Sequence, residues 1–390
     1  MAANTLTFNQ CATLLNAINQ QATGQTNITP TDTASFVSLA NTTLQTGYDP
    51  VINAISQVLS KTVFSVRPYS RKFSGLFMDA ARWGNHVRKL QVVDKTAEED
   101  DRILLQDGEP IDQQVVNKPS VLQTNFYGAN VYQRSITIFK DQLDCAFSSP
   151  EEFGRFITMI LQNVSDLIEK DHENMARMAL VNFIAAKVSK DGGNVIKLVT
   201  KYNDATGLEL TAETVRQPEN FVPFMKWAYA YIKTVSDLMT ERSTKFHVNI
   251  TGKPISRHTP KDRQKLYMYA ADVNNIEASV LSSVFHDGYL KEMDYETVNY
   301  WQSIETPMGI QAKAGYIDAN GAAQTTADNV VQSNILGVLF DEEAVGVTTV
   351  NTWSASAPFN ARGGYTNTFW HFTDRYFNDL TENGVVFLLE

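Results

Sequence analysis

Charged side chains are scarce in this 390-residue sequence, at 19% of residues against about a quarter in an ordinary globular protein. Hydrophobic residues make up 43% and aromatic residues 11%, which excludes a disordered chain. A low charge fraction in so long a chain indicates that other subunits cover part of its surface. The alternative is a large monomer with a neutral surface.

Positive charge is the scarcer sign, with 33 Lys and Arg against 43 Asp and Glu and a net charge of −10. This balance argues against a dedicated nucleic-acid binder, because phosphate contacts require clustered Lys and Arg. An acidic chain can still wall a container for nucleic acid, since a repelling inner surface does not hold on to DNA.

Cysteines and long apolar runs are also few. The two cysteines, Cys11 and Cys145, lie far apart, which predicts no disulfide framework and a reducing compartment. The start, MAANTLTFNQ, has no basic stretch followed by an apolar run, and no run of 18 apolar residues occurs. We therefore expect no secretory signal, no membrane contact and synthesis in the cytoplasm.

Short motifs for catalysis, cofactors or metals are missing. No two of the six histidines lie three to five residues apart, and the cysteines form no CxxC pair. Lys253 lacks the upstream glycine of a phosphate-binding loop, and Ser74 lacks the preceding glycine of a nucleophile elbow. We expect no catalytic, cofactor-binding or metal-binding residue, and the alternative is a triad assembled from distant residues.

Three charged clusters stand out. The acidic runs 98–101 and 341–343 lack the spacing of a calcium loop, so we expect solvated turns. The third cluster is basic, and we expect it to pair with an acidic strip on a neighbouring subunit. DNA contact and an ordinary charged surface remain alternatives for it. Its members are Arg67, Arg71, Lys72, Arg82, Arg88 and Lys89.

The first part of the chain has few features of an independent core. Asp32 and Asp49 are the only charged side chains in residues 1–60, and about half of residues 1–47 are Asn, Thr, Gln or Ser. This composition favours an arm that docks on neighbouring subunits.

Residues 61–125 predict two long β arms around a charged tip. A two-stranded ribbon is marginal alone and is best explained by partners across which it lies.

Helix and strand patterns follow in the rest of the chain. Ser149-Pro150-Glu151-Glu152 is a capping box, and an apolar stripe at helical spacing predicts a helix of about 57 Å over about 150–187. A second helix is expected over about 220–240, and Asp272 could cap a third. Together these elements suggest a compact α/β unit over about 218–325. The strands expected from β patterns are 121–139, 246–250, 265–270, 335–340, 345–350, 369–377 and 385–389.

This order of parts resembles the major capsid proteins of tailed bacteriophages, which have the Hong Kong 97-type shell fold. Ser149-Pro-Glu-Glu looks like the start of the spine helix, and Lys265-Leu-Tyr-Met-Tyr-Ala-Ala-Asp272 like a strand-to-helix step of the axial domain. Ile335-Leu-Gly-Val-Leu-Phe-Asp-Glu-Glu343, followed by Val345-Gly-Val-Thr, looks like peripheral-domain strands. The resemblance covers essentially the whole chain and depends on layout more than on one motif.

The resemblance implies an α+β fold with five parts. They are an N-terminal arm (1–60), an extended β-hairpin loop (61–125), a peripheral domain with the spine helix at about 150–187 (126–217), an axial domain (218–325) and the C-terminal strands of the peripheral domain (326–390). In this family the loop lies over the adjacent subunit and the arm runs beneath neighbours, which would account for segments without a core.

The function that the resemblance implies is structural and not enzymatic. Such a chain assembles with itself into hexamers and pentamers that close an icosahedral head shell around double-stranded DNA, without sequence-specific binding. Scaffolding, portal and in some cases decoration proteins are the other expected partners, and the protein is found in the virion after synthesis in the bacterial cytoplasm. The alternatives are an encapsulin-like compartment shell that packages protein, an uncharacterised cytoplasmic α/β enzyme, and another virion part such as a tail or portal protein.

Overall fold

The structure of the chain is a computed structural model of residues 1–390. It describes all residues except 1–5, 26–28, 62–71, 79–86, 94–105, 109, 111–113, 115, 117, 119, 127–129, 191–193, 250–254, 282–294 and 319–321.

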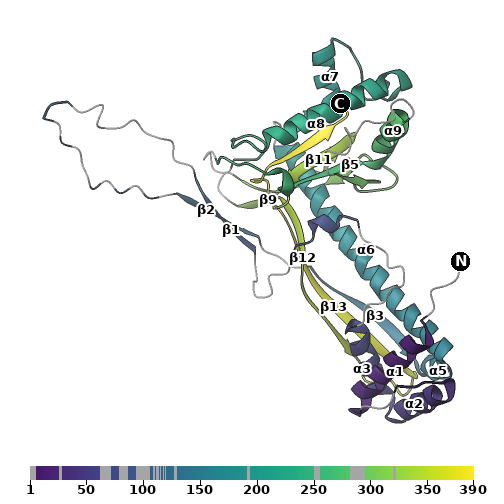
Figure 1. Cartoon of the computed structure of the whole chain (residues 1–390). Coiled ribbons are helices and arrows are strands. Elements are labelled where there is room, and N and C mark those ends of the chain that lie inside the picture. Colours follow the sequence, from purple (N-terminus) through teal and green to yellow (C-terminus); the bar gives the residue numbers. More distant parts are fainter. Residues whose placement is uncertain are drawn as a thin grey trace.

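A single long helix, α6 (Pro150–Lys190), runs through most of the length of the molecule (Figure 1). The hydroxyl of Ser149 accepts a hydrogen bond from the backbone N–H of Glu152 at 3.2 Å, as the capping pattern predicted. Acidic residues in the first turn and lysines in the last turn complement the helix dipole. The predicted helix is therefore confirmed, and it continues three residues beyond the expected end.

A five-stranded sheet lies at one end of α6, with the strand order β4-β14-β11-β5-β6. The central strand β11 pairs antiparallel with both β14 and β5, whereas the edge strands β4 and β6 pair in parallel with β14 and β5. Every residue of β11 is buried, which is typical of a strand covered on both faces. The strands are β4 (Val195–Lys197), β5 (Gln264–Tyr269), β6 (Glu296–Val298), β11 (Ile335–Asp341) and β14 (Gly384–Leu388).

Side chains of β11 alternate between the two hydrophobic cores that cover this sheet. Val338 and Phe340 pack toward the C-terminal half of α6, whereas Leu336 and Leu339 pack toward three helices on the other face. Those helices are α7 (Leu198–Thr206), α8 (Pro218–Leu238) and α9 (Ala270–Leu281).

Three sequence-based expectations differ from the structure in this region. The compact unit expected over 218–325 takes its central strands β11 and β14 from the C-terminal part of the chain, which we had assigned to a separate unit. Residues 246–249 form no strand, because Phe246 has a left-handed backbone conformation (φ 68°). Asp272 lies in the first turn of α9 and does not cap it.

A three-stranded antiparallel sheet, in the order β12-β13-β3, lies alongside the N-terminal half of α6 (Figure 1). Its strands are β3 (Asn130–Phe139), β12 (Val345–Ser356) and β13 (Tyr365–Asn378). Trp370 and Phe372 are buried on the inner face of β13, whereas Tyr376 on the same face is 45% exposed.

Residues 8–61 form three helices, which we call the helical cap: α1 (Phe8–Thr23), α2 (Thr33–Gln45) and α3 (Tyr48–Lys61). They share one hydrophobic core with α5 (Lys140–Ala146) and the first turns of α6. Phe36 stacks edge-on against Phe153 at 5.7 Å between ring centroids. The expectation of an arm without a core is therefore wrong for this segment, which packs on its own chain.

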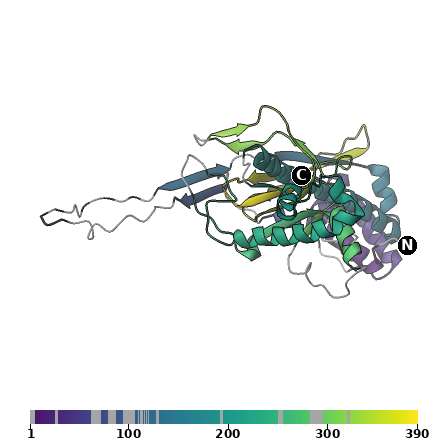
Figure 2. The same cartoon turned by 90° about the horizontal axis from the view of Figure 1, so that it is seen from above.

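A two-stranded antiparallel ribbon, β1 (Val87–Val92) and β2 (Val121–Phe126), extends from the side of the molecule (Figures 1 and 2). We call it the ribbon. Its first strand lies within the range 61–125 expected for a hairpin, whereas its second strand lies in the range 121–139 that was expected as a later strand. The acidic run 98–101 lies outside the described residues.

The remaining elements are η1 (Ser74–Leu76), η2 (Thr214–Arg216), η3 (Lys261–Arg263) and the pairs β7 (Ile310–Ala312) with β10 (Val330–Gln332) and β8 (Gly315–Ile317) with β9 (Ala323–Thr325).

Candidate functional site: the charged anchor of the ribbon

The two faces of the ribbon have different surroundings. Leu90, Val92 and Val121 are 58%, 63% and 56% exposed, and the pairing of Val92 with Val121 places all three on one face. The alternate residues Gln91 and Thr124 are buried against the body of the protein. The ribbon therefore presents an apolar face outward while its other face holds it in place.

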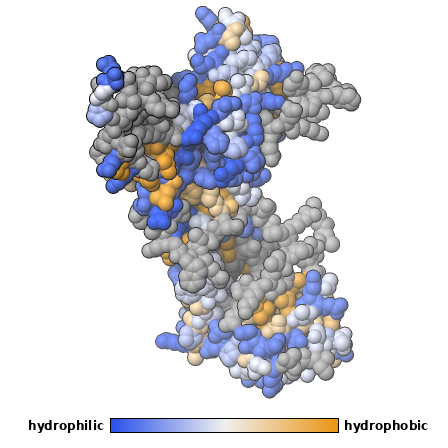
Figure 3. Space-filling view, turned by 60° about the vertical axis from the view of Figure 1, so that its left-hand side comes forward, coloured by the Kyte–Doolittle hydropathy of each residue, from blue (hydrophilic) through white to orange (hydrophobic). Residues whose placement is uncertain are grey.

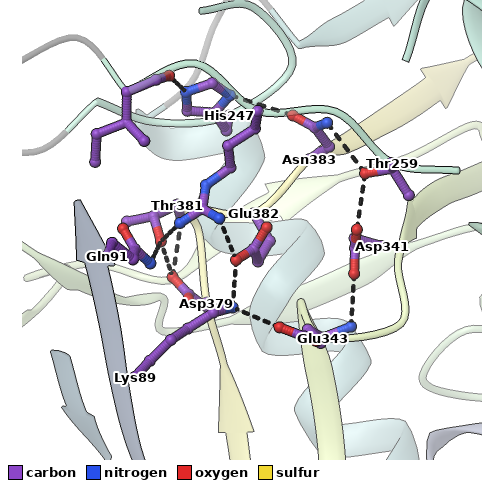
Figure 4. A network of polar contacts seen from close by, with 12 residues as sticks. Lys89, Gln91, His247, Thr259, Asp341, Glu343, Asp379, Thr381, Glu382 and Asn383 are labelled. Atoms are coloured by element: carbon purple, nitrogen blue, oxygen red, sulfur yellow. Dashed lines mark hydrogen bonds and ion pairs between the residues drawn. The ribbon is translucent and has the colours of Figure 1, made fainter. Parts of the chain in front are cut away.

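Lys89 is the central residue of the inner face (Figure 4). Its ammonium group lies 3.2 Å from Asp379 Oδ2 and 3.4 Å from Glu343 Oε2, and it also pairs with Glu382. Asp379 and Glu382 belong to the turn between β13 and β14, and Glu343 to the turn between β11 and β12. One side chain thus ties the ribbon to two turns that are distant in sequence.

Further hydrogen bonds hold the same turn. Arg257 pairs with Glu382 at 2.6 Å, and it donates to the hydroxyl of Thr381 at 3.3 Å. The Gln91 amide donates to the same hydroxyl at 3.2 Å, while that hydroxyl donates to Asp379 at 2.6 Å. The second inward-facing residue of β1 therefore reaches the same turn as Lys89.

The acidic run 341–343 belongs to this cluster, so the expectation of a solvated turn is wrong. Asp341 is buried and accepts a hydrogen bond from Thr259 at 2.8 Å. Arg263 donates to both Glu342 and Glu343, each at 2.6 Å. No local pattern indicates this burial, because the partners lie about 80 and 250 residues away in the chain.

A buried histidine closes the cluster on its far side. His247 lies with Nδ1 3.2 Å from Asn383 Oδ1 and 2.9 Å from the Lys245 carbonyl, and with Nε2 2.7 Å from the Ile255 carbonyl. The Asn383 amide in turn donates to Thr259 at 3.1 Å. This chain of contacts fixes the irregular segment before η3 against the turn that binds Lys89.

Charge and burial decide the protonation states. Burial lowers the pKa of Lys89, but the carboxylates of Asp379, Glu382 and Glu343 together outweigh it and raise the pKa above its ordinary value. Burial raises the pKa of Glu382 despite its two cations. Burial also lowers the pKa of His247. The cluster accordingly holds a charged lysine at one end and a neutral histidine at the other.

Lys89 and its three carboxylate partners hold the ribbon against the rest of the protein. Every residue that Figure 4 labels contacts another labelled residue, and the contacts hold separate structural elements together. In the part of the chain that the structure describes, no three His, Cys, Asp or Glu side chains gather as ligands of a metal ion. None of the helices described could cross a membrane.

The structure describes only some members of the basic cluster named in the sequence analysis. Lys89 pairs with carboxylates of its own chain, whereas pairing with a neighbouring subunit was expected. Lys72 contributes its backbone N–H to Glu173 at 3.1 Å. Arg67, Arg71 and Arg82 lie outside the described residues. No short-range pattern in the sequence marks the turn residues 379–383 as partners of β1.

Comparisons with known proteins agree with this architecture. A family model described as Phi29-like phage major capsid protein matches residues 15–388. A chain in the capsid structure of Staphylococcus phage Andhra has the same fold, with 9% identity, a TM-score of 0.50 and coverage of 84% of this chain and 87% of that chain. A chain in the structure of the head fiber and inner core protein gp22 of native bacteriophage P68 has 8% identity, a TM-score of 0.53 and the same coverage. No curated protein matches the sequence.

Proposed function

The chain belongs to the Phi29-like phage major capsid protein family, and we propose that it builds the head in the Hong Kong 97-type arrangement, as pentamers and hexamers around double-stranded DNA. It is a structural shell protein of a tailed phage and is located in the virion. Copies of the chain assemble with one another into that shell.

We assign the parts of the molecule to the domains of that arrangement as follows. The three-stranded sheet, the helical cap and α6 correspond to the peripheral domain with its spine helix. The five-stranded sheet with α7, α8 and α9 corresponds to the axial domain, and the ribbon corresponds to the extended loop. These assignments replace the sequence-based boundaries, because β4, β11 and β14 belong to the same sheet as β5.

The ribbon is the observation that carries the proposal. A two-stranded ribbon has too little core to be stable alone, yet this one is anchored by a buried charge cluster and turns three apolar side chains to solvent. Burying the exposed parts of Leu90, Val92 and Val121 on an adjacent subunit would stabilise the contact by about 1 kcal/mol for each side chain. In a shell, each subunit makes this contact together with many others, so weak contacts add up to a stable assembly.

The charge and surface of the chain support the proposal that the shell encloses DNA and that the chain contacts other proteins. A net charge of −10 suits a wall that encloses DNA without binding it tightly. Figure 3 shows the ribbon side of the molecule with hydrophobic surface among hydrophilic surface, as expected of a chain that contacts other proteins. We propose scaffolding and portal proteins as assembly partners, and decoration proteins as a further class.

Two pairs of serine substitutions test the ribbon contact. The pair Leu90→Ser and Val92→Ser removes apolar surface from the ribbon, whereas Ile304→Ser and Val331→Ser remove similarly exposed side chains (75% and 70%) elsewhere. We expect both proteins to fold, and only the ribbon variant to lose closed shells in electron microscopy. Normal shells from the ribbon variant would refute the role given to the ribbon.

A further inference from the structure

The three-stranded sheet has one face that is turned away from α6. Side chains alternate between the two faces of a sheet, and the even-numbered Arg134 points to the helix, where it donates to Asp171 of α6 at 2.9 Å. The odd-numbered residues of 131–139, 351–355 and 365–373 form the opposite face, which we call the outer face. On the two edge strands, β3 and β12, every one of these residues is exposed. None of them is Asp, Glu, Lys or Arg, so the outer face is a solvent-facing surface without acidic or basic side chains.

Two pairs of aromatic rings stand on the outer face, one near each end. Trp353 of β12 stacks on its cross-strand neighbour His371, with 3.9 Å between ring centroids and 14° between ring planes. At the other end, Phe139 of β3 packs edge-on against its neighbour Tyr365, at 6.0 Å between centroids. Trp353 is 51% and Phe139 47% exposed, so each pair offers ring surface to a ligand while its rings hold one another in place. Tyr365 and His371 are six residues apart on β13, which separates the two pairs by about 20 Å.

Amide and hydroxyl groups lie between the two aromatic pairs. The Thr137 hydroxyl donates to Oδ1 of its cross-strand neighbour Asn367 at 2.7 Å, which fixes the amide and leaves its NH2 group to donate to a ligand. Gln133 and Ser135 on β3 are exposed and add a second amide and a second hydroxyl. The outer face therefore combines flat ring surface with uncharged hydrogen-bond donors and acceptors.

We propose that the outer face of the three-stranded sheet is a binding site for a linear, uncharged oligosaccharide. A sugar ring has a face of C–H groups, whose partial positive charge is attracted to the negative face of an aromatic ring. Its hydroxyl groups both donate and accept hydrogen bonds, so they pair with the amides and hydroxyls between the two aromatic pairs. This site goes beyond the role of the chain in building a shell, and it gives the protein an affinity for neutral sugar polymers.

Size and charge both favour this ligand over a macromolecule. Three strands about 4.8 Å apart and a length of about 20 Å give a strip of about 200 Å², whereas a stable protein interface buries about 800 Å² on each partner. Nucleic acid requires Lys or Arg next to its phosphates, and the outer face carries neither. A single neutral sugar chain lies along a narrow strip and needs no countercharge, so it matches both properties.

Calorimetric titration of the full-length, unassembled chain with linear hexasaccharides of glucose, mannose, galactose and N-acetylglucosamine tests the assignment. One variant, Trp353→Ala, removes an aromatic ring from the outer face. A second, Asn367→Asp, keeps the oxygen that accepts from Thr137 but replaces the NH2 donors with a charge. The control, Tyr376→Ala, removes a similarly exposed ring (45%) from the opposite face of β13. Thermal unfolding first establishes that each protein is folded, and if Trp353→Ala is not, Asn367→Asp decides alone.

We expect at least one hexasaccharide to bind at one site per chain, and its disaccharide to bind at least about tenfold more weakly because it cannot reach both aromatic pairs. Trp353→Ala and Asn367→Asp should each weaken binding by at least about tenfold, whereas Tyr376→Ala should bind as the unsubstituted chain does.

Three results would overturn the inference in the unassembled chain: no binding of any of the four hexasaccharides, unchanged binding in the folded outer-face variants, or an equal loss in Tyr376→Ala. Assembled shells should bind the same hexasaccharide. Shells that do not bind it would show that another copy of the chain covers the outer face, which would overturn the inference as well. Absence of shells from the unsubstituted chain would instead refute the proposed function.

Discussion

Replacing Lys89 with Met should release the root of the ribbon without unfolding the rest of the protein. The substitution keeps an unbranched apolar stem but removes the charge that pairs with Asp379, Glu382 and Glu343. Glu382 retains Arg257, whereas the Asp379 carboxylate keeps, among the described residues, its hydrogen bonds with Thr381. Removing one partner of a buried ion pair costs about 3–5 kcal/mol, because the other charge is left buried.

The partial exposure of Lys89 determines how large a free-energy cost we expect from Lys89→Met. Its side chain is 18% exposed, so water offsets some of the loss and we expect the lower end, about 3 kcal/mol. That free energy corresponds to an increase on the order of 100-fold in the opening of the ribbon. Hydrogen exchange of the amides that pair β1 with β2 measures this opening directly.

Two further variants make the Lys89 prediction specific. Arg88→Met changes the neighbouring, exposed residue on the other face of β1 and should leave exchange in the ribbon nearly unchanged. Adding Glu382→Gln to Lys89→Met removes a buried carboxylate and should recover part of the protection, which a double-mutant cycle measures. If Lys89→Met exchanges no faster than Arg88→Met, the charge cluster does not hold the ribbon.

Three other predictions concern the body of the protein. Burial lowers the pKa of His247 in the folded protein below its unfolded value of about 6.5, so the unfolded chain binds more protons between these two pKa values. The free energy of unfolding should therefore fall as the pH decreases from about 6.5. A His247→Gln variant whose free energy of unfolding falls equally over this range would contradict this prediction. Gly384→Ala places a Cβ 2.6 Å from the Phe183 ring and should cost about 1–3 kcal/mol in chemical denaturation, whereas Gly315→Ala, with 3.5 Å of room, should cost much less. Phe153→Ala should cost about 3–5 kcal/mol by emptying the core beneath the helical cap, and an unchanged melting temperature would show that the cap does not depend on it.

Local patterns in the sequence were sufficient to locate the long helix and most strands. The capping residues at Ser149–Glu152 and the apolar stripe after them act over a few residues, so they can be recognised without tertiary information. The N-terminal segment was misjudged because its composition outweighed its pattern. Leu14, Leu15 and Ile18 have the spacing of a buried helix face, and the structure buries all three.

Long-range pairing could not be predicted in the same way. The five-stranded sheet joins β4, near residue 196, to β14, near residue 386, and no local signal identifies these partners. The same reason explains the misreading of 341–343 as a solvated turn. An acidic run has the same appearance whether it faces water or a lysine, and here the lysine, Lys89, comes from a ribbon 254 positions earlier.

High-resolution electron microscopy of assembled particles tests the central claim most directly. The account predicts closed shells of pentamers and hexamers in which the face bearing Leu90, Val92 and Val121 is buried on an adjacent subunit, while Lys89 remains paired within its own chain. Particles in which this face of the ribbon stays in solvent, or a purified protein that forms only small oligomers even with its assembly partners present, would contradict it.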